Sequence, residues 1–366
     1  MDTDTPIGLP PVPTPKAALQ SLLPSTCGTL YALPELSGHP KKSFALGWNS
    51  DGSFLASGST DKSVRIWDPE IHSFTECTGH TDTVNQLMWN PTSTNHLATA
   101  GADKSVRLWD AKSSKSTSSV ALPSNVQTVA YSHDGKYIAA LCTGSSRDTC
   151  SISLIDTRKH KVVTRMPTPY EFQDMIFSDS GFLFAAAGHS TGYGTLEVLQ
   201  IVPDAADKKA PPALENVHKV HAAHSGSCFA IDLDKSGRYV RLHIHPLHLL
   251  PHRLLALGGV DSLVSLWDLD EVYCKQTFIC AQSRIRFVKF SHDGVFLASG
   301  SDDLTVPIID VASGQAAFSI ALQEPPQQMA WHPSKHVLAY LGDAPALEKN
   351  KDRQGVIKLA AVKPTA

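Results

Sequence analysis

The sequence predicts an all-β protein, a seven-bladed β-propeller closed by a strand from its N-terminal region. Three observations lead to this prediction. A polar four-residue pattern recurs in units made of short β-rich segments, and the units repeat about every 40 to 45 residues along most of the chain. One further strand-like segment precedes the first unit.

The clearest unit is residues 79–110, which opens with Gly-His and closes with Trp-Asp. Three β-rich segments lie between these ends, at 84–89, 96–100 and 105–109, and a polar turn around Asp103 joins the last two. This order of strands and turn is typical of one WD40 blade.

The polar pattern of this unit comprises His80, Thr99, Asp103 and Trp109. A buried carboxylate, imidazole or indole is costly unless it is hydrogen-bonded, so these residue types favour a series of mutual hydrogen bonds. The same pattern recurs in unit one as His39, Ser57, Asp61 and Trp67, and in unit five as His224, Asp261 and Trp267. We predict that all three sets are structural networks.

Seven units can be counted from the dipeptide that closes the third strand of each. These dipeptides are Trp67-Asp68, Trp109-Asp110, Ile155-Asp156, Leu199-Gln200, Trp267-Asp268, Ile309-Asp310 and Leu359-Ala360. The steps between them are 42, 46, 44, 68, 42 and 50 residues, and all but the step of 68 lie near the blade period. Turn aspartates recur as well, with Asp303 in unit six. Units one, two and five have the strongest polar networks, so the other four are expected to rely more on apolar packing.

A ring of blades needs closure, because an open ring leaves two unpaired sheet edges. The isolated β-rich segment at 26–33 meets this need. We predict that it forms the outer strand of the last blade, beside segments 327–331, 337–341 and 356–359.

The predicted domain is residues 26–366, preceded by a disordered proline-rich tail at 1–25. Unit five is extended by a linker at 203–213 and by an inserted loop at about 241–254. The insertion contains four histidines, His243, His245, His248 and His252, but a structural zinc site needs four fixed ligands and this run has two prolines and neither cysteine nor carboxylate. A lineage-specific surface loop and translated intron sequence both remain open.

Composition narrows the class of function. The net charge of -3 gives no positive electrostatic potential that would favour binding of nucleic-acid phosphates. No apolar run is long enough to span a membrane. The seven cysteines form no CxxC pair, and the N-terminus does not resemble a signal peptide, so we expect an intracellular chain with reduced thiols. There is no phosphate-binding loop or HExxH motif, and each Ser-His-Asp set has the spacing of the structural network. We therefore predict no enzymatic activity, cofactor, metal or small-molecule substrate.

The segment Asp261–Gly314 contains the run LVSLWDLDE and the turn FSHDG. It resembles the WD40 subunit of the THO complex, the subunit three family, and residues 79–91, 329–333 and 355–359 are similar to that family too. Two features depart from the resemblance: the histidine-rich insertion, and Pro307 in the third strand of unit six, where a backbone donor is lost.

The resemblance implies a nuclear, non-enzymatic scaffold subunit of the THO/TREX complex, which couples transcription to mRNP assembly and mRNA export. Its implied partners are the large scaffold subunits of that complex and, indirectly, a DEAD-box RNA helicase, an export adaptor and mRNA. The alternative is a generic WD40 adaptor in a chromatin-modifying or ubiquitin-ligase complex.

Overall fold

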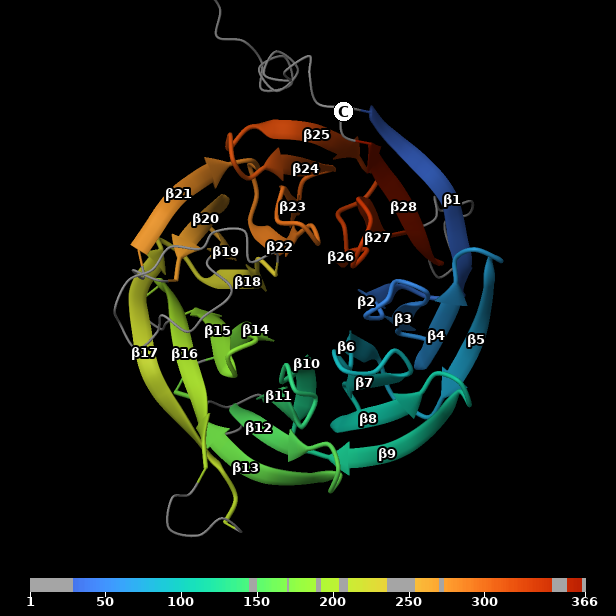
Figure 1. Ribbon diagram of the computed structural model, residues 1–366, viewed down its shortest axis with the longest axis vertical. Helices are drawn as coiled ribbons and strands as arrows, with labels where there is room; N and C mark the ends of the chain where they lie inside the picture. The colour runs from blue at the N-terminus through green and yellow to red at the C-terminus, as the bar shows by residue number, and fades with distance from the viewer. Residues whose placement is uncertain are drawn as a thin grey trace, which may run out of the picture.

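Short apolar and β-branched runs, separated by turns rich in Gly, Asp and Ser, fold into strands that form a ring of seven antiparallel sheets (Figure 1). The computed structural model describes residues 29–144, 150–169, 171–188, 192–203, 210–235, 254–269, 273–343 and 354–363. Among these residues there is no helix, and hence none with the length and hydropathy needed to cross a membrane. The predicted seven-bladed propeller is confirmed.

Each blade has four strands, counted outward from the ring axis (Figure 1). The innermost strands of blades one to seven are β2 (Ser43–Trp48), β6 (Val84–Trp89), β10 (Asn125–Tyr131), β14 (Phe172–Phe177), β18 (Cys228–Leu233), β22 (Ile285–Phe290) and β26 (Met329–Trp331). The second strands are β3 (Leu55–Ser59), β7 (His96–Gly101), β11 (Tyr137–Thr143), β15 (Phe182–Gly188), β19 (Leu254–Gly259), β23 (Phe296–Ser301) and β27 (Val337–Asp343).

The third strands are β4 (Ser63–Asp68), β8 (Ser105–Asp110), β12 (Ser151–Asp156), β16 (Gly194–Val202), β20 (Leu263–Asp268), β24 (Thr305–Asp310) and β28 (Gly355–Lys363). The outer strands are β5 (Ser73–Thr78), β9 (Lys115–Ala121), β13 (Lys161–Pro167), β17 (Ala213–His224), β21 (Tyr273–Ile279), β25 (Ala316–Ala321) and, for blade seven, β1 (Thr29–His39). We call the face with the loops between first and second strands the bottom face, and the opposite one the top face.

Strand β1 closes the ring, as the sequence predicted. It pairs antiparallel with β28 from Thr29↔Lys363 to His39↔Gly355, so the first described strand of the chain completes the sheet of the last. The strand continues beyond the predicted end at residue 33, because pairing resumes after a bulge at Pro34, whose missing N–H suits such a position.

The apolar core consists of seven layers, each shared by two neighbouring blades. One layer joins blade seven to blade one and includes Leu36 of β1. Trp67 and Trp109 are among the largest fully buried side chains. Because every blade packs on two neighbours, removing one contact layer would expose apolar surface on both sides.

Pro307 shortens the pairing inside blade six. The β23–β24 ladder extends only from Phe296↔Asp310 to Ala298↔Ile308, whereas the corresponding ladder of blade five has two further pairs. The ladder ends at Ile308, the residue that follows Pro307, because proline has no N–H to donate.

The predicted tail at 1–25 lies outside the described residues, as do 204–209 of the linker and 241–253 of the insertion. After the insertion, the second strand of blade five begins at Leu254. The six cysteines among the described residues form no disulfide bond with one another.

Removing β1 should open the ring. Deletion of residues 1–24 leaves β1 intact, whereas deletion of residues 1–34 removes the half of β1 that pairs with residues 359–363 and exposes the edge of β28. We expect the longer deletion to lower the melting temperature by several degrees relative to the shorter one, measured by differential scanning fluorimetry. Equal melting of both variants would contradict closure by β1.

Candidate functional site: polar relays and the central channel

Blade two contains a buried chain of hydrogen bonds among the four residues of the polar pattern. Trp109 Nε1 lies 2.8 Å from Thr99 Oγ1, Thr99 Oγ1 lies 2.7 Å from His80 Nε2, and His80 Nδ1 lies 2.8 Å from Asp103 Oδ2. Asp103 also accepts from the backbone N–H of Thr81 and from Ser105. We call this chain a relay.

The hydrogen-bond donors of the relay indicate the protonation state of His80. The indole can only donate to Thr99, so the threonine hydroxyl has its proton available for His80 Nε2, and His80 Nδ1–H donates to the carboxylate. This order requires a neutral imidazole, in agreement with burial, which lowers the pKa of His80. Burial acts to raise the pKa of Asp103, but hydrogen bonds from Ser105, Thr81 and His80 hold it below its ordinary value.

Blade one has the same relay. Trp67 Nε1 donates to Ser57 Oγ at 2.8 Å, and His39 bridges Ser57 and Asp61 at 2.8 Å on each side. Burial acts to raise the pKa of Asp61, but its bonds to His39 and Ser63 lower it to about 2. His39 is the last residue of β1, so this relay also fastens the closing strand to blade one.

In blade five the hydroxyl comes from a residue that the sequence pattern did not identify. His224 contacts Asp261 at 2.9 Å and Ser265 Oγ at 2.7 Å, and Trp267 Nε1 donates to the same hydroxyl at 2.8 Å. Ser265 is on the third strand, directly opposite Leu257, whereas Ser57 and Thr99 are on the second strand. The hydroxyl therefore comes from the third strand in blade five and from the second strand in blades one and two, and it makes the same hydrogen bonds in all three relays.

The order Asp-His-Ser is also that of a catalytic triad, but these hydroxyls are sealed from solvent. Ser57 and Thr99 are 0% exposed and Ser265 is 1% exposed. Each hydroxyl accepts the indole N–H, and no substrate carbonyl can reach it. The relays are therefore placed to hold the blades together.

Blade six shows the relay in a reduced form. Cys280 takes the place of the histidine, with Sγ 3.5 Å from Ser299 Oγ, and Ile309 takes the place of the tryptophan. The turn aspartate Asp303 remains and accepts the backbone N–H of Gln282 at 2.7 Å. The loop is still tied to the turn, but no imidazole depends on this carboxylate.

Replacement of Asp103 by Ala should destabilise the protein by about 1 to 3 kcal/mol, because His80 keeps a buried donor without an acceptor. The Trp109 N–H retains Thr99 as its acceptor. Asp303→Ala is the matched control and should cost less, because that aspartate has no histidine partner. Urea unfolding of both variants tests this, and equal losses would show that the imidazole contributes nothing.

A channel runs along the axis of the ring and is lined by the innermost strands. Its top half is a cavity of about 490 Å³ and its bottom half one of about 410 Å³. Both halves share Gln86, Asp174, Lys289 and Gln328, which we call the channel waist. The rim of the top half carries Arg284 and Arg286, both paired with Asp302, and Arg284 also lies over the ring of Phe229.

The waist contains charged side chains that are partly buried. Lys289 Nζ lies 3.5 Å from Asp232 Oδ1, and Asp232 also accepts the backbone N–H of Phe290. Burial raises the pKa of Asp174 to about 6, against the lowering effects of the Lys289 charge and of the N–H groups of Met175 and Ile231. Burial acts to lower the pKa of Lys289, but the charges of Asp232 and Asp174 raise it above its ordinary value.

Because the folded pKa of Asp174 exceeds the ordinary 3.8, the folded state binds the proton more tightly, and the stability from this group is lost as pH rises from about 4 to about 6. Asp174→Asn keeps an acceptor for Ile231 and removes the charge. The free energy of unfolding of this variant, relative to that of the unmodified chain, should rise by at most about 3 kcal/mol between these pH values, since one pKa unit corresponds to about 1.4 kcal/mol. Above this range the difference should stay constant. Urea unfolding of both chains at several pH values measures this difference. A difference that does not change with pH would contradict the prediction.

The bottom face has a pocket of about 330 Å³ between blades seven and one, beside β1. Trp48 lines it and packs against His332 in a tilted arrangement, with ring centroids 4.8 Å apart. The equivalent tryptophans Trp89 and Trp331 donate to backbone carbonyls of the preceding blade, whereas the buried Trp48 N–H has no hydrogen-bond partner among the described residues.

Comparisons with known proteins agree with this architecture. A model of the WD domain, G-beta repeat, matches residues 31–68, 71–110 and 272–310. THO complex subunit 3 of Arabidopsis thaliana is 35% identical over 330 residues, which cover 89% of this chain and 94% of that protein. WD repeat-containing protein AAC3 of Dictyostelium discoideum is 29% identical over 352 residues, 90% of this chain and 66% of that protein. A guanine nucleotide-binding protein subunit beta of Nicotiana plumbaginifolia is 26% identical over 254 residues.

Proposed function

Because the chain belongs to the WD40 family of THO complex subunit 3, we propose that it is a scaffold subunit of a nuclear THO complex and acts through protein contacts. The observation that carries this proposal is the extent of the similarity. It spans 89% of this chain and 94% of the Arabidopsis protein, so it extends over most of the propeller and is not limited to a few shared repeats.

The structure supports a role without catalysis. The Ser-His-Asp groups are sealed inside the blades, and the closed ring holds its loops on two rigid faces. A propeller of this kind offers surfaces on which other proteins assemble. The channel rim and the Trp48 pocket are the hollowed parts of these surfaces.

The finer proposal concerns the partners. We infer that the chain docks on the large scaffold subunits of the complex and connects only indirectly to a DEAD-box RNA helicase, an export adaptor and mRNA. The net charge of -3 favours protein contact over a primary grip on RNA, which requires a concentrated positive surface. In this role the protein would link transcription to mRNP assembly and mRNA export.

Affinity purification of the tagged chain from nuclear extract, followed by mass spectrometry, tests the proposal. We expect the other THO subunits in comparable amounts, and we expect them to remain after nuclease treatment because the contacts are between proteins. The variant lacking residues 1–24 should recover the same partners, and the variant lacking residues 1–34 should lose them because its ring is open.

Recovery of histone-modifying enzymes or a cullin in place of THO subunits would overturn the proposal. That outcome would identify the chain as a WD40 adaptor of a chromatin-modifying or ubiquitin-ligase complex. Loss of the THO subunits on nuclease treatment would instead show that RNA holds the assembly together.

A further inference from the structure

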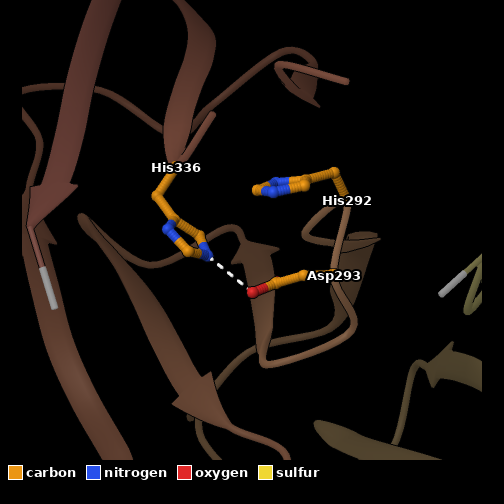
Figure 2. Close-up of side chains that lie close together, drawn as sticks. All are labelled: His292, Asp293 and His336. Carbon is orange, nitrogen blue, oxygen red and sulfur yellow. Dashed lines mark hydrogen bonds and ion pairs between the residues drawn. The ribbon is translucent and has the colours of Figure 1, made fainter. Parts of the chain in front are cut away.

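Two histidines and an aspartate converge on the bottom face, where blade six meets blade seven. Figure 2 shows the imidazoles of His292 and His336 and the carboxylate of Asp293 pointing toward one another. One ligand atom from each residue lies within 4.8 Å of the other two, and all three side chains are partly buried. His336 Nε2 lies 3.0 Å from Asp293 Oδ2.

The turn that carries Asp293 orients its carboxylate. Oδ1 accepts from the hydroxyl of Ser291 at 2.7 Å and from the backbone N–H of Val295 at 3.2 Å. Gly294 supplies the left-handed conformation of the turn, with φ of 66°. With Oδ1 held in this way, Oδ2 faces His336, and such outer contacts are what fix a carboxylate ligand in a metal site.

The same turn occurs in blade three, which provides an internal comparison. The sequence Ser-His-Asp-Gly stands at 132–135 as well as at 291–294, and Asp134 Oδ1 is held by Ser132 and by the N–H of Lys136. There, however, Asp134 Oδ2 pairs with Lys136 at 2.7 Å, and His133 pairs with Asp179. Only the blade-six turn meets a histidine from the next blade, among the described residues.

We propose that His292, Asp293 and His336 form a binding site for a borderline divalent metal ion, with zinc as the best match. Two imidazole nitrogens and a carboxylate oxygen are among the ligands that zinc prefers, and three protein ligands leave a fourth position for water. Ligand atoms about 2.0 to 2.1 Å from a tetrahedral zinc are about 3.3 Å apart. The pair His336 and Asp293 is already this close, and the His292 ring would have to move toward them by up to about 1.5 Å. Calcium and magnesium prefer oxygen ligands and do not suit this set.

A bound ion would link the two blades beside the ring closure. His336 immediately precedes β27, and its carbonyl accepts the backbone N–H of Val362 in β28, the strand that pairs with β1. Zinc would therefore join blade six to blade seven, the blade that contains both the first and the last described strand. This inference does not depend on the proposed function.

The test measures zinc binding by the full-length chain, purified without a histidine tag. The four histidines of the insertion, at 243, 245, 248 and 252, are first replaced by glutamine, so that any zinc measured cannot be attributed to them. We expect one zinc ion per chain by calorimetry, and X-ray absorption should report two imidazole ligands. At a zinc concentration of about one hundred times Kd, the melting temperature should rise by about 3 °C.

Asp293→Asn and His336→Gln should each weaken zinc binding at least tenfold. Asn retains the oxygen that accepts from Ser291 and Val295, so the turn remains formed. Asp134→Asn in blade three is the matched control and should bind zinc as tightly as the starting chain. Equal affinity in all variants, no stoichiometric binding, or an absorption spectrum without imidazole ligands would each overturn the proposal. The spectrum does so without any substitution in the cluster itself.

Discussion

The pairing of β1 with β28 is the interaction on which the rest of the ring depends. Without it, the third strand of blade seven would present a row of unpaired backbone groups at an edge, and the apolar layer between blades seven and one would lose Leu36. The relay of blade one adds a second attachment, because His39 ends β1 and bonds to Ser57 and Asp61. Two sets of hydrogen bonds thus close the ring: the backbone ladder between β1 and β28, and the side-chain relay of blade one.

The blades around this closure are not equally polar. Complete relays occur in blades one, two and five, where the indole, hydroxyl, imidazole and carboxylate satisfy one another. Blade six keeps the turn aspartate but has a thiol and an isoleucine in place of imidazole and indole. Its ladder is also shortened at Pro307, and its turn carries Asp293. Among the described blades that have a turn aspartate, blade six therefore differs most from blades one, two and five.

Much of the fold could be predicted from the sequence because its determinants are local. The Trp-Asp spacing, the turn aspartates and the isolated N-terminal strand specify seven blades and their closure without any long-range information. Ser265 was missed because the pattern expects a hydroxyl on the second strand, and nothing in the sequence says that the position opposite Leu257 can replace it.

The channel waist and the histidine-aspartate cluster could not be predicted, for a different reason. Asp174 and Lys289 of the waist and the neighbouring Asp232 come from three blades, and His336 reaches Asp293 from the next blade. Such contacts depend on how neighbouring blades pack, which a repeat pattern does not encode. The one available signal for the cluster was the repeated Ser-His-Asp-Gly turn, and it does not show which copy meets a histidine.

The register Thr29↔Lys363 has a consequence for how the chain is made. A ribosome that adds about 5 to 20 residues per second needs roughly 20 to 70 seconds to synthesise the chain between these partners. During that time β1 has no strand to pair with, and six blades can form while the seventh is incomplete. The nascent propeller therefore carries an open edge until β28 has been synthesised, and a chaperone that shields β1 would act in this interval.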